Sequence, residues 1–121
     1  MKDNETVKNK LQMITFQGKE VFINGISYYE VKRGLLAANA TAKLSIFNQI
    51  CEEFGIIFLD NQAIFDNASE IYADLKQRGE LIGDADILIA AMAITQNLVL
   101  ISDDIDDFQR INGITLENWL R

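Results

Sequence analysis

Two aspartates stand at the start of an apolar segment, with a spacing that could hold a hard cation. Asp84 and Asp86 follow Gly83, which permits a sharp turn, and Ile87–Ile94 then consists of apolar and small residues typical of a buried helix. Asp84 falls where an N-cap would lie. Asp86 falls in the first turn, where free N–H groups and the helix dipole favour an ionised carboxylate. The plainer interpretation is that both aspartates only cap the helix.

Further carboxylates follow two predicted strands. Glu30 falls in the first turn of the helix expected after Val21–Ile23, and Asp103 and Asp104 directly follow the apolar run Leu98–Ile101. In open parallel sheets, ligands bind at the C-terminal edge of the strands. Carboxylates gathered there repel one another unless a cation is present, and Mg²⁺ prefers oxygen ligands while keeping several waters. The placement therefore favours a magnesium site that generates a hydroxide and stabilises in-line phosphoryl displacement.

Each of these acids also has a purely structural interpretation. Glu30 fits a capping box with Ser27, and Asp104 with Asp107 fits an N-cap and N3 pair. Asp106 and Asp107 fit a solvated face. For each acid alone the structural interpretation is the better one. It is less plausible that all of these interpretations are correct at once for acids that lie at one edge of one sheet.

The composition excludes several classes of chemistry. The chain has no histidine, which removes Ser-His-Asp and Cys-His nucleophiles and histidine metal sites, and it has no Walker or dinucleotide glycine motif. Its one cysteine, Cys51, lies in a helical apolar stripe, which indicates a core thiol and suits a reducing cytoplasm. No apolar run approaches the roughly 18 residues of a membrane span, and no signal peptide is visible.

Charge is distributed unevenly along the chain. Residues 1–60 hold seven basic and seven acidic side chains, so the net charge of −7 falls wholly in residues 61–121. Seven acids lie between Glu80 and Asp107. Such a region is either a solvated acidic face or a cation site, and it argues against binding nucleic acid by charge alone.

Helical and strand patterns alternate along 121 residues, which predicts one α/β domain. The strand segments are short and wholly apolar, which is typical of a parallel sheet covered by helices on both faces. The expected helices are 3–14, Ser27–Ala38, Thr41 to Gly55, and Asp60 or Asn61 to Gly79, followed by the helix that begins at Asp84 and an acidic turn near Asp106. The expected strands are Val21–Ile23, Ile56–Leu59, Leu98–Ile101 and Ile114–Glu117.

Three stretches together resemble a PIN-domain protein, specifically a VapC-type toxin of a toxin–antitoxin pair. They are Ile26–Gly34, Ile82–Ala91, and Leu100–Asp104 continuing to Phe108, with a further match in the tail Gly113–Trp119. The resemblance implies a three-layer α/β/α PIN-like fold with a short parallel sheet. It also implies an endoribonuclease with four acids around Mg²⁺ or Mn²⁺.

The resemblance assigns these acids to particular positions. Glu30 corresponds to the second acid, Asp86 to the third, and Asp104 or its neighbour Asp103 to the fourth, whereas Asp84 is the helix cap. These acids are the expected catalytic and metal-binding residues. Lys32 and Arg33 are the nearest basic candidates for a phosphate contact, although a solvated helix face is the slightly better interpretation. The implied partners are an RNA substrate, an antitoxin, and a second copy of the chain paired through apolar residues such as Phe16, Tyr28 and Tyr29.

The chain departs from the family pattern at its start. PIN proteins begin with an apolar central strand that ends in the first acid. Here Asp3 has no strand before it and lies only 27 residues from Glu30. The expectation is a single PIN-like domain over 1–121 that lacks the first strand and first catalytic Asp. The alternative function is a non-catalytic module that binds an antitoxin or self-associates. A phosphoacceptor or nucleotide-binding domain is a weaker third interpretation, because no phosphate-binding glycine loop is present.

Overall fold

The computed structural model describes residues 13, 22–102 and 104–118, which fall into two units. One unit runs from Gln12 to Leu59, and the other contains the residues from Asp60 onward; each is described here by itself. The helix predicted over 3–14 lies outside the described residues except for Met13, which is helical. Phe16, Val21 and Asp103 also lie outside them.

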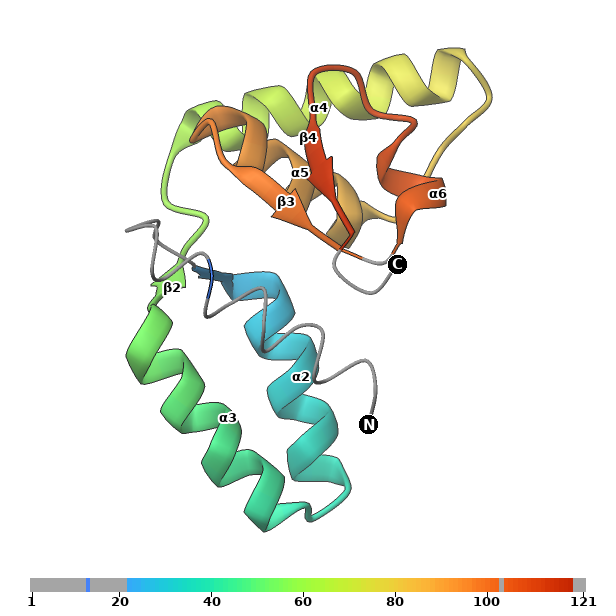
Figure 1. The fold of residues 1–121 in the computed structure, drawn as a ribbon. Coiled ribbons are helices and arrows are strands. Elements are labelled where there is room, and N and C mark those ends of the chain that lie inside the picture. Colours follow the sequence, from blue (N-terminus) through green and yellow to red (C-terminus); the bar gives the residue numbers. More distant parts are fainter. Residues whose placement is uncertain (1–12, 14–21, 103, 119–121) are drawn as a thin grey trace. The chain divides into compact units, whose positions relative to one another are not determined.

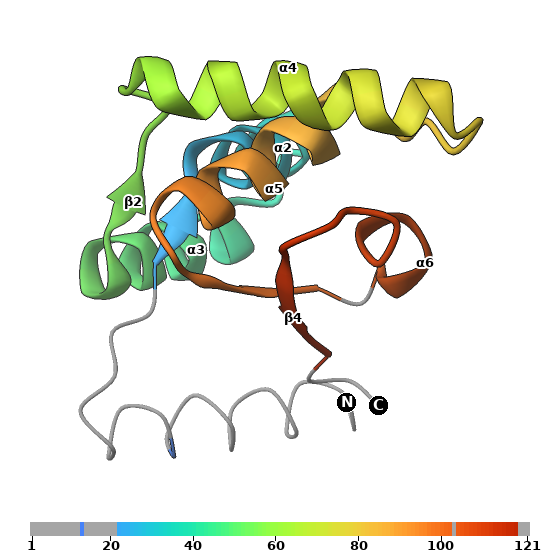
Figure 2. The same ribbon diagram turned by 90° about the horizontal axis from the view of Figure 1, so that it is seen from above.

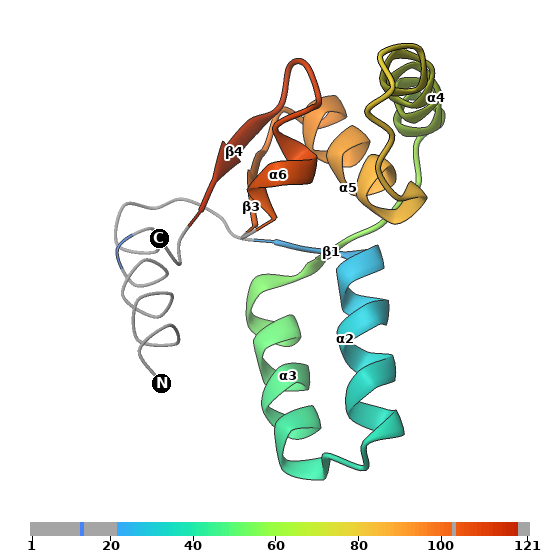
Figure 3. The same ribbon diagram turned by 90° about the vertical axis from the view of Figure 1, so that its right-hand side faces the viewer.

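The first unit is a helical hairpin attached to a short parallel strand pair. Its elements are β1 (Ile23–Asn24), α2 (Gly25–Ala37), α3 (Thr41–Phe54) and β2 (Ile56–Ile57). The two helices run side by side in opposite directions (Figure 3). Helix α3 ends at Gly55, whose φ of +80° suits glycine, and the Gly55 carbonyl accepts a hydrogen bond from the Ile23 N–H at 3.1 Å. Strands β1 and β2 then pair in parallel, with Ile23 opposite Ile56.

Helix α2 begins at Gly25, two residues earlier than the predicted start at Ser27. Its N-cap is Asn24, whose side-chain oxygen accepts a hydrogen bond from the Ser27 N–H at 2.7 Å. The predicted capping box between Ser27 and Glu30 is therefore wrong, and Glu30 lies beyond the first turn. The reason is competition between neighbouring caps, because Asn is as strong an N-cap as Ser and Asn24 comes first.

Cys51 is the only described residue of the first unit that is buried, which confirms the prediction of a core thiol. Its burial raises the pKa of the thiol, while the nearby charge of Lys32 acts in the opposite direction. A neutral, buried thiol is a poor nucleophile. The rest of its helical stripe is less covered, since Ile46 and Ile50 are exposed, although Phe47 stacks on Tyr28 with ring centres 5.7 Å apart.

The second unit contains two long helices, a strand pair and a single helical turn. Its elements are α4 (Gln62–Gln77), α5 (Asp84–Thr95), β3 (Val99–Ile101), α6 (Ile105–Phe108) and β4 (Thr115–Glu117). Helix α4 is capped by Asn61, one of the two predicted caps, whose side chain accepts from the Ala63 N–H at 2.8 Å. Strands β3 and β4 pair in parallel, with Leu100 opposite Leu116.

Helices α4 and α5 lie side by side and form the core of the second unit (Figures 1 and 2). Helix α4 buries Ile64, Ala68 and Leu75, which share one face of the helix. Helix α5 is buried over much of its circumference, including Ile87, Ile89 and the run Ala90–Ala93. The Asn67 amide donates to Thr95 Oγ1 at 2.7 Å, so a polar contact also joins the two helices.

The prediction that the apolar strand before Asp103 is buried on both faces is wrong for β3. Val99 is 47% exposed and Ile101 is 39% exposed, whereas Leu100 between them is half-buried. Successive side chains of a strand point to opposite faces, so one face of β3 is covered and the other is open among the described residues. An apolar run alone therefore did not distinguish a strand covered on one side from a strand covered on two.

The alternation of helices with short parallel strands is confirmed. The expectations that the chain lacks the family's first strand, and that it forms a single domain, stay predictions. No helix among the described residues is long and apolar enough to cross a membrane.

Candidate metal centre

The first acid of the candidate site lies at the start of the buried helix α5. Gly83 is the N-cap, with extended backbone, and the Ile87 N–H donates to the Gly83 carbonyl at 3.1 Å. Asp84 and Asp86 both fall in the first turn. Asp84 is thus the first helical residue and not the cap that the sequence predicted, and it is exposed, whereas Asp86 is half-buried. The helix dipole stabilises negative charge at both positions.

Two further acids come from the single turn α6. Asp104 is the N-cap of this turn, and its Oδ1 accepts a hydrogen bond from the Asp107 N–H at 3.3 Å. The predicted N-cap pair of Asp104 and Asp107 is therefore confirmed. Phe108 and Ile111 are both about 4% exposed, so apolar burial at the end of the turn anchors it to the core.

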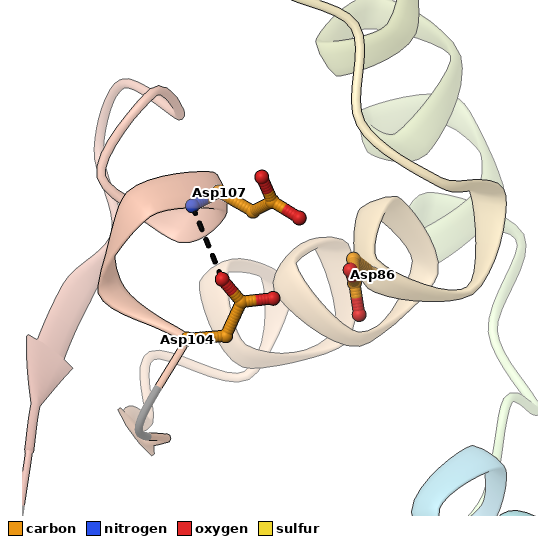
Figure 4. A group of neighbouring side chains, drawn as sticks. All are labelled: Asp86, Asp104 and Asp107. Atoms are coloured by element: carbon orange, nitrogen blue, oxygen red, sulfur yellow. Dashed lines mark hydrogen bonds between the residues drawn. The ribbon is translucent and has the colours of Figure 1, made fainter.

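The carboxylates of Asp86, Asp104 and Asp107 converge (Figure 4). One carboxylate oxygen from each residue lies within 4.8 Å of those from the other two. All three side chains are half-buried, so they are partly withdrawn from water without being enclosed. Three carboxylates at this separation repel one another, and a divalent cation among them would remove that repulsion.

Asp107 is the residue that sequence reasoning missed. It was expected on a solvated face together with Asp106, and only Asp106 is exposed there. The signal was present in the spacing, because Asp104 and Asp107 are three residues apart across a cap. Both side chains of the pair point to the same side of the turn, as Figure 4 shows.

The structure brings together two of the three predicted site residues, Asp86 and Asp104. Glu30 lies on the exposed side of α2 in the other unit, and its role in the site stays a prediction. Asp103, the alternative to Asp104, lies outside the described residues.

The two basic candidates on α2 contact aromatic side chains. Lys32 Nζ donates to the Tyr28 hydroxyl at 2.7 Å, and the Arg33 guanidinium lies 5.0 Å from the ring centre of Tyr29. Tyr28 is half-buried rather than exposed as predicted, whereas Tyr29 is 60% exposed. Both cations are thus held along their own helix, which fits the predicted solvated helix face.

The donor set of the acid cluster fits a hard divalent cation. Its donors are all carboxylate oxygens, which Mg²⁺ and Mn²⁺ prefer over nitrogen or sulfur. Asp104 uses one oxygen in the cap, which leaves the other free for a ligand bond. A nearby polar hollow of about 520 Å³, lined by Arg78, Gly79, Glu80, Gln109, Arg110 and Asn112, includes none of the three aspartates.

Comparison with known proteins identifies the family of the chain. The model of the PIN domain matches residues 2–114 of the chain. The chain belongs to the PIN-domain family. This confirms the resemblance inferred from the sequence and, with it, the PIN-like fold.

Relatives of this PIN-domain chain are VapC proteins. It is 39% identical over 70 residues to ribonuclease VapC2 of Rickettsia felis, a match that covers 52% of each chain. It is 35% identical to ribonuclease VapC1 of Methanocaldococcus jannaschii, covering 78% of this chain and 67% of the relative. The match to ribonuclease VapC2 of Haemophilus influenzae covers only 38% of that protein, so the chain spans about half or less of some relatives.

Solved structures share the fold of this PIN domain. VapBC2 from Rickettsia felis bound to a promoter DNA fragment is 27% identical with a TM-score of 0.82, covering 93% of this chain and 84% of that one. DNA-bound VapBC from Salmonella typhimurium has a TM-score of 0.84 at 23% identity, covering 95% of this chain and 85% of that one. The second likeness supports the fold alone.

Proposed function

We propose that this PIN-domain protein is a metal-dependent endoribonuclease and the toxin of a toxin–antitoxin pair. The observation that carries the proposal is the convergence of Asp86, Asp104 and Asp107 within 4.8 Å, in a chain whose relatives are named ribonucleases. In this proposal the three aspartates, together with Glu30, hold Mg²⁺ or Mn²⁺. The protein would act in the cytoplasm, an assignment that fits a chain with one cysteine.

The chain's own residues have distinct tasks in this proposal. Asp86 presents its carboxylate from helix α5, which is held in place by its buried residues. Asp104 and Asp107 present theirs from a turn that is closed by the hydrogen bond between them. The bound cation would polarise a phosphoryl oxygen and supply a hydroxide nucleophile. Preorganised carboxylates need little rearrangement when the ion arrives, which favours both binding and catalysis.

The proposed protein partner is an antitoxin that covers the apolar surface of the α2–α3 hairpin. Large apolar side chains are exposed on these helices, including Tyr29, Val31, Leu36, Ile46 and Ile50. A partner that covered these helices would remove their exposed apolar side chains from water. Two solved structures that share this fold are VapBC assemblies, from Rickettsia felis and Salmonella typhimurium. Pairing with a second copy of the chain is part of the same proposal.

The proposed activity is tested by RNA cleavage with and without divalent cation. We expect the purified chain to cut single-stranded RNA in Mn²⁺ or Mg²⁺ and to lose the activity in EDTA, because only oxygen ligands for a metal are gathered at the site. Restoring Mn²⁺ after EDTA should recover the cleavage. Equal cleavage in EDTA and in Mn²⁺ would contradict the metal-dependent mechanism, and no cleavage in either would favour the non-catalytic binding module.

A further inference from the structure

Arg110 connects the segments that carry the acid cluster. It follows α6, and its Nη2 lies 3.9 Å from Asp107 Oδ1. Its Nη1 donates to the backbone carbonyls of Glu80 and Leu81, both at 3.4 Å, in the connector that leads into α5. One guanidinium therefore reaches both the turn that carries Asp107 and the segment that precedes Asp86.

A second arginine holds the first in place. Arg78 Nη2 donates to the Arg110 carbonyl at 2.6 Å. The same side chain binds Asp74 Oδ2 at 2.8 Å and Glu80 Oε2 at 3.0 Å, and these acids raise the pKa of Arg78. Arg78 thus ties the end of α4 and the connector to Arg110, the second residue after α6. We call the two arginines the arginine clamp.

The clamp contributes little as a set of ion pairs. The Arg110 and Asp107 side chains are each more than a third exposed, and pairs of this kind add at most about 1 kcal/mol to stability. Its contribution is geometric, because a guanidinium presents several donors in a fixed planar fork. Groups that orient metal ligands typically change metal affinity by about 10–100-fold when removed.

We propose that Arg110, held by Arg78, is a positioning residue that keeps the Asp104–Asp107 turn at ligand distance from Asp86. The inference rests on the proposed function, since it requires the three aspartates to bind a cation. The ion pair with Arg110 is made by one carboxylate oxygen of Asp107, Oδ1. If the guanidinium positions the turn, removing it should weaken Mn²⁺ binding. If only its positive charge matters, removing it should strengthen Mn²⁺ binding. The two effects have opposite signs, which makes the role testable.

The test is the Mn²⁺ affinity of Arg110→Ala, measured by titration calorimetry at fixed ionic strength. Removing a cation beside the cluster should tighten Mn²⁺ binding by electrostatics alone. Loss of positioning should weaken it, and we expect a dissociation constant about tenfold higher than that of the wild type. Arg110→Lys keeps the charge but replaces the planar fork with one ammonium group, so we expect it to weaken Mn²⁺ binding as well. Lys76→Ala is the matched control, because it removes an exposed cation near the end of α4 and should leave the affinity unchanged.

The outcomes separate this inference from the proposed function. A wild-type chain that binds no Mn²⁺ would overturn both. Wild-type binding with equal or tighter binding by Arg110→Ala would overturn the positioning role alone, as would a raised KM for RNA at unchanged Mn²⁺ affinity. If Arg110→Ala does not fold, Arg110→Lys decides, and wild-type affinity in that variant would show that the fork is not required.

Discussion

Asp86→Asn should lower metal-dependent RNA cleavage by about 100-fold or more, since loss of a ligand should exceed the roughly 10–100-fold cost of losing a group that only orients ligands. The amide keeps the size of the side chain but removes the negative charge that Mn²⁺ or Mg²⁺ requires. The stability of the metal-free chain should change by no more than about 1 kcal/mol, because the lost first-turn charge near the helix dipole is offset by relief of its repulsion from Asp104 and Asp107. Cleavage rates and Mn²⁺ affinity are measured on the same preparation, and circular dichroism checks the fold.

Asp84→Asn is the matched control for this experiment. Asp84 lies in the same first turn, is exposed, and does not belong to the acid cluster. Its replacement should cause a similar loss of helix-dipole stabilisation and leave cleavage nearly unchanged. If both variants cleave RNA as the wild type does, Asp86 only stabilises the helix and the proposed metal centre is wrong at that residue.

Ile64→Ala should lower the free energy of unfolding by about 2–5 kcal/mol, the range for large-to-alanine changes in a core. Ile64 is 0% exposed in the core between α4 and α5, so its truncation leaves a cavity as well as losing buried apolar surface. The same packing supports the helix that presents Asp86. Urea unfolding followed by circular dichroism at 222 nm measures the change.

The neighbouring residue on α4 supplies the comparison. Phe65 is 47% exposed, and Phe65→Ala should change stability by only about 0.5 kcal/mol, as is usual for surface substitutions. A similar loss in the two variants would mean that α4 does not bury the face described here.

Local signals predicted the helices better than the burial of the strands. The Asn61 cap and the stop at Gly55 follow from neighbouring residues, and both are confirmed. Competing caps were harder to separate, since Asn24 took the place of Ser27. The exposure of Val99 depends on what covers β3, which is a property of tertiary packing and not of the strand's own sequence.

The acid cluster was predictable in part, because local sequence signals mark two of its three members. Asp86 and Asp104 follow signals in the chain, a helix start and a strand end. Asp107 joins them because it lies in the turn that Asp104 caps, which spacing alone suggests but does not establish. The arginine clamp was not predictable, because Arg110 contacts Glu80 and Leu81 about 30 residues away in sequence.

The most direct test of the metal centre is a crystal structure of the chain grown with Mn²⁺, with anomalous diffraction recorded at the manganese absorption edge. We predict an anomalous peak among Asp86, Asp104 and Asp107, within about 2.0–2.6 Å of carboxylate oxygens, as hard divalent cations bind. A peak only at other acids, such as Asp74 or Glu80, or no peak at saturating Mn²⁺, would contradict the account.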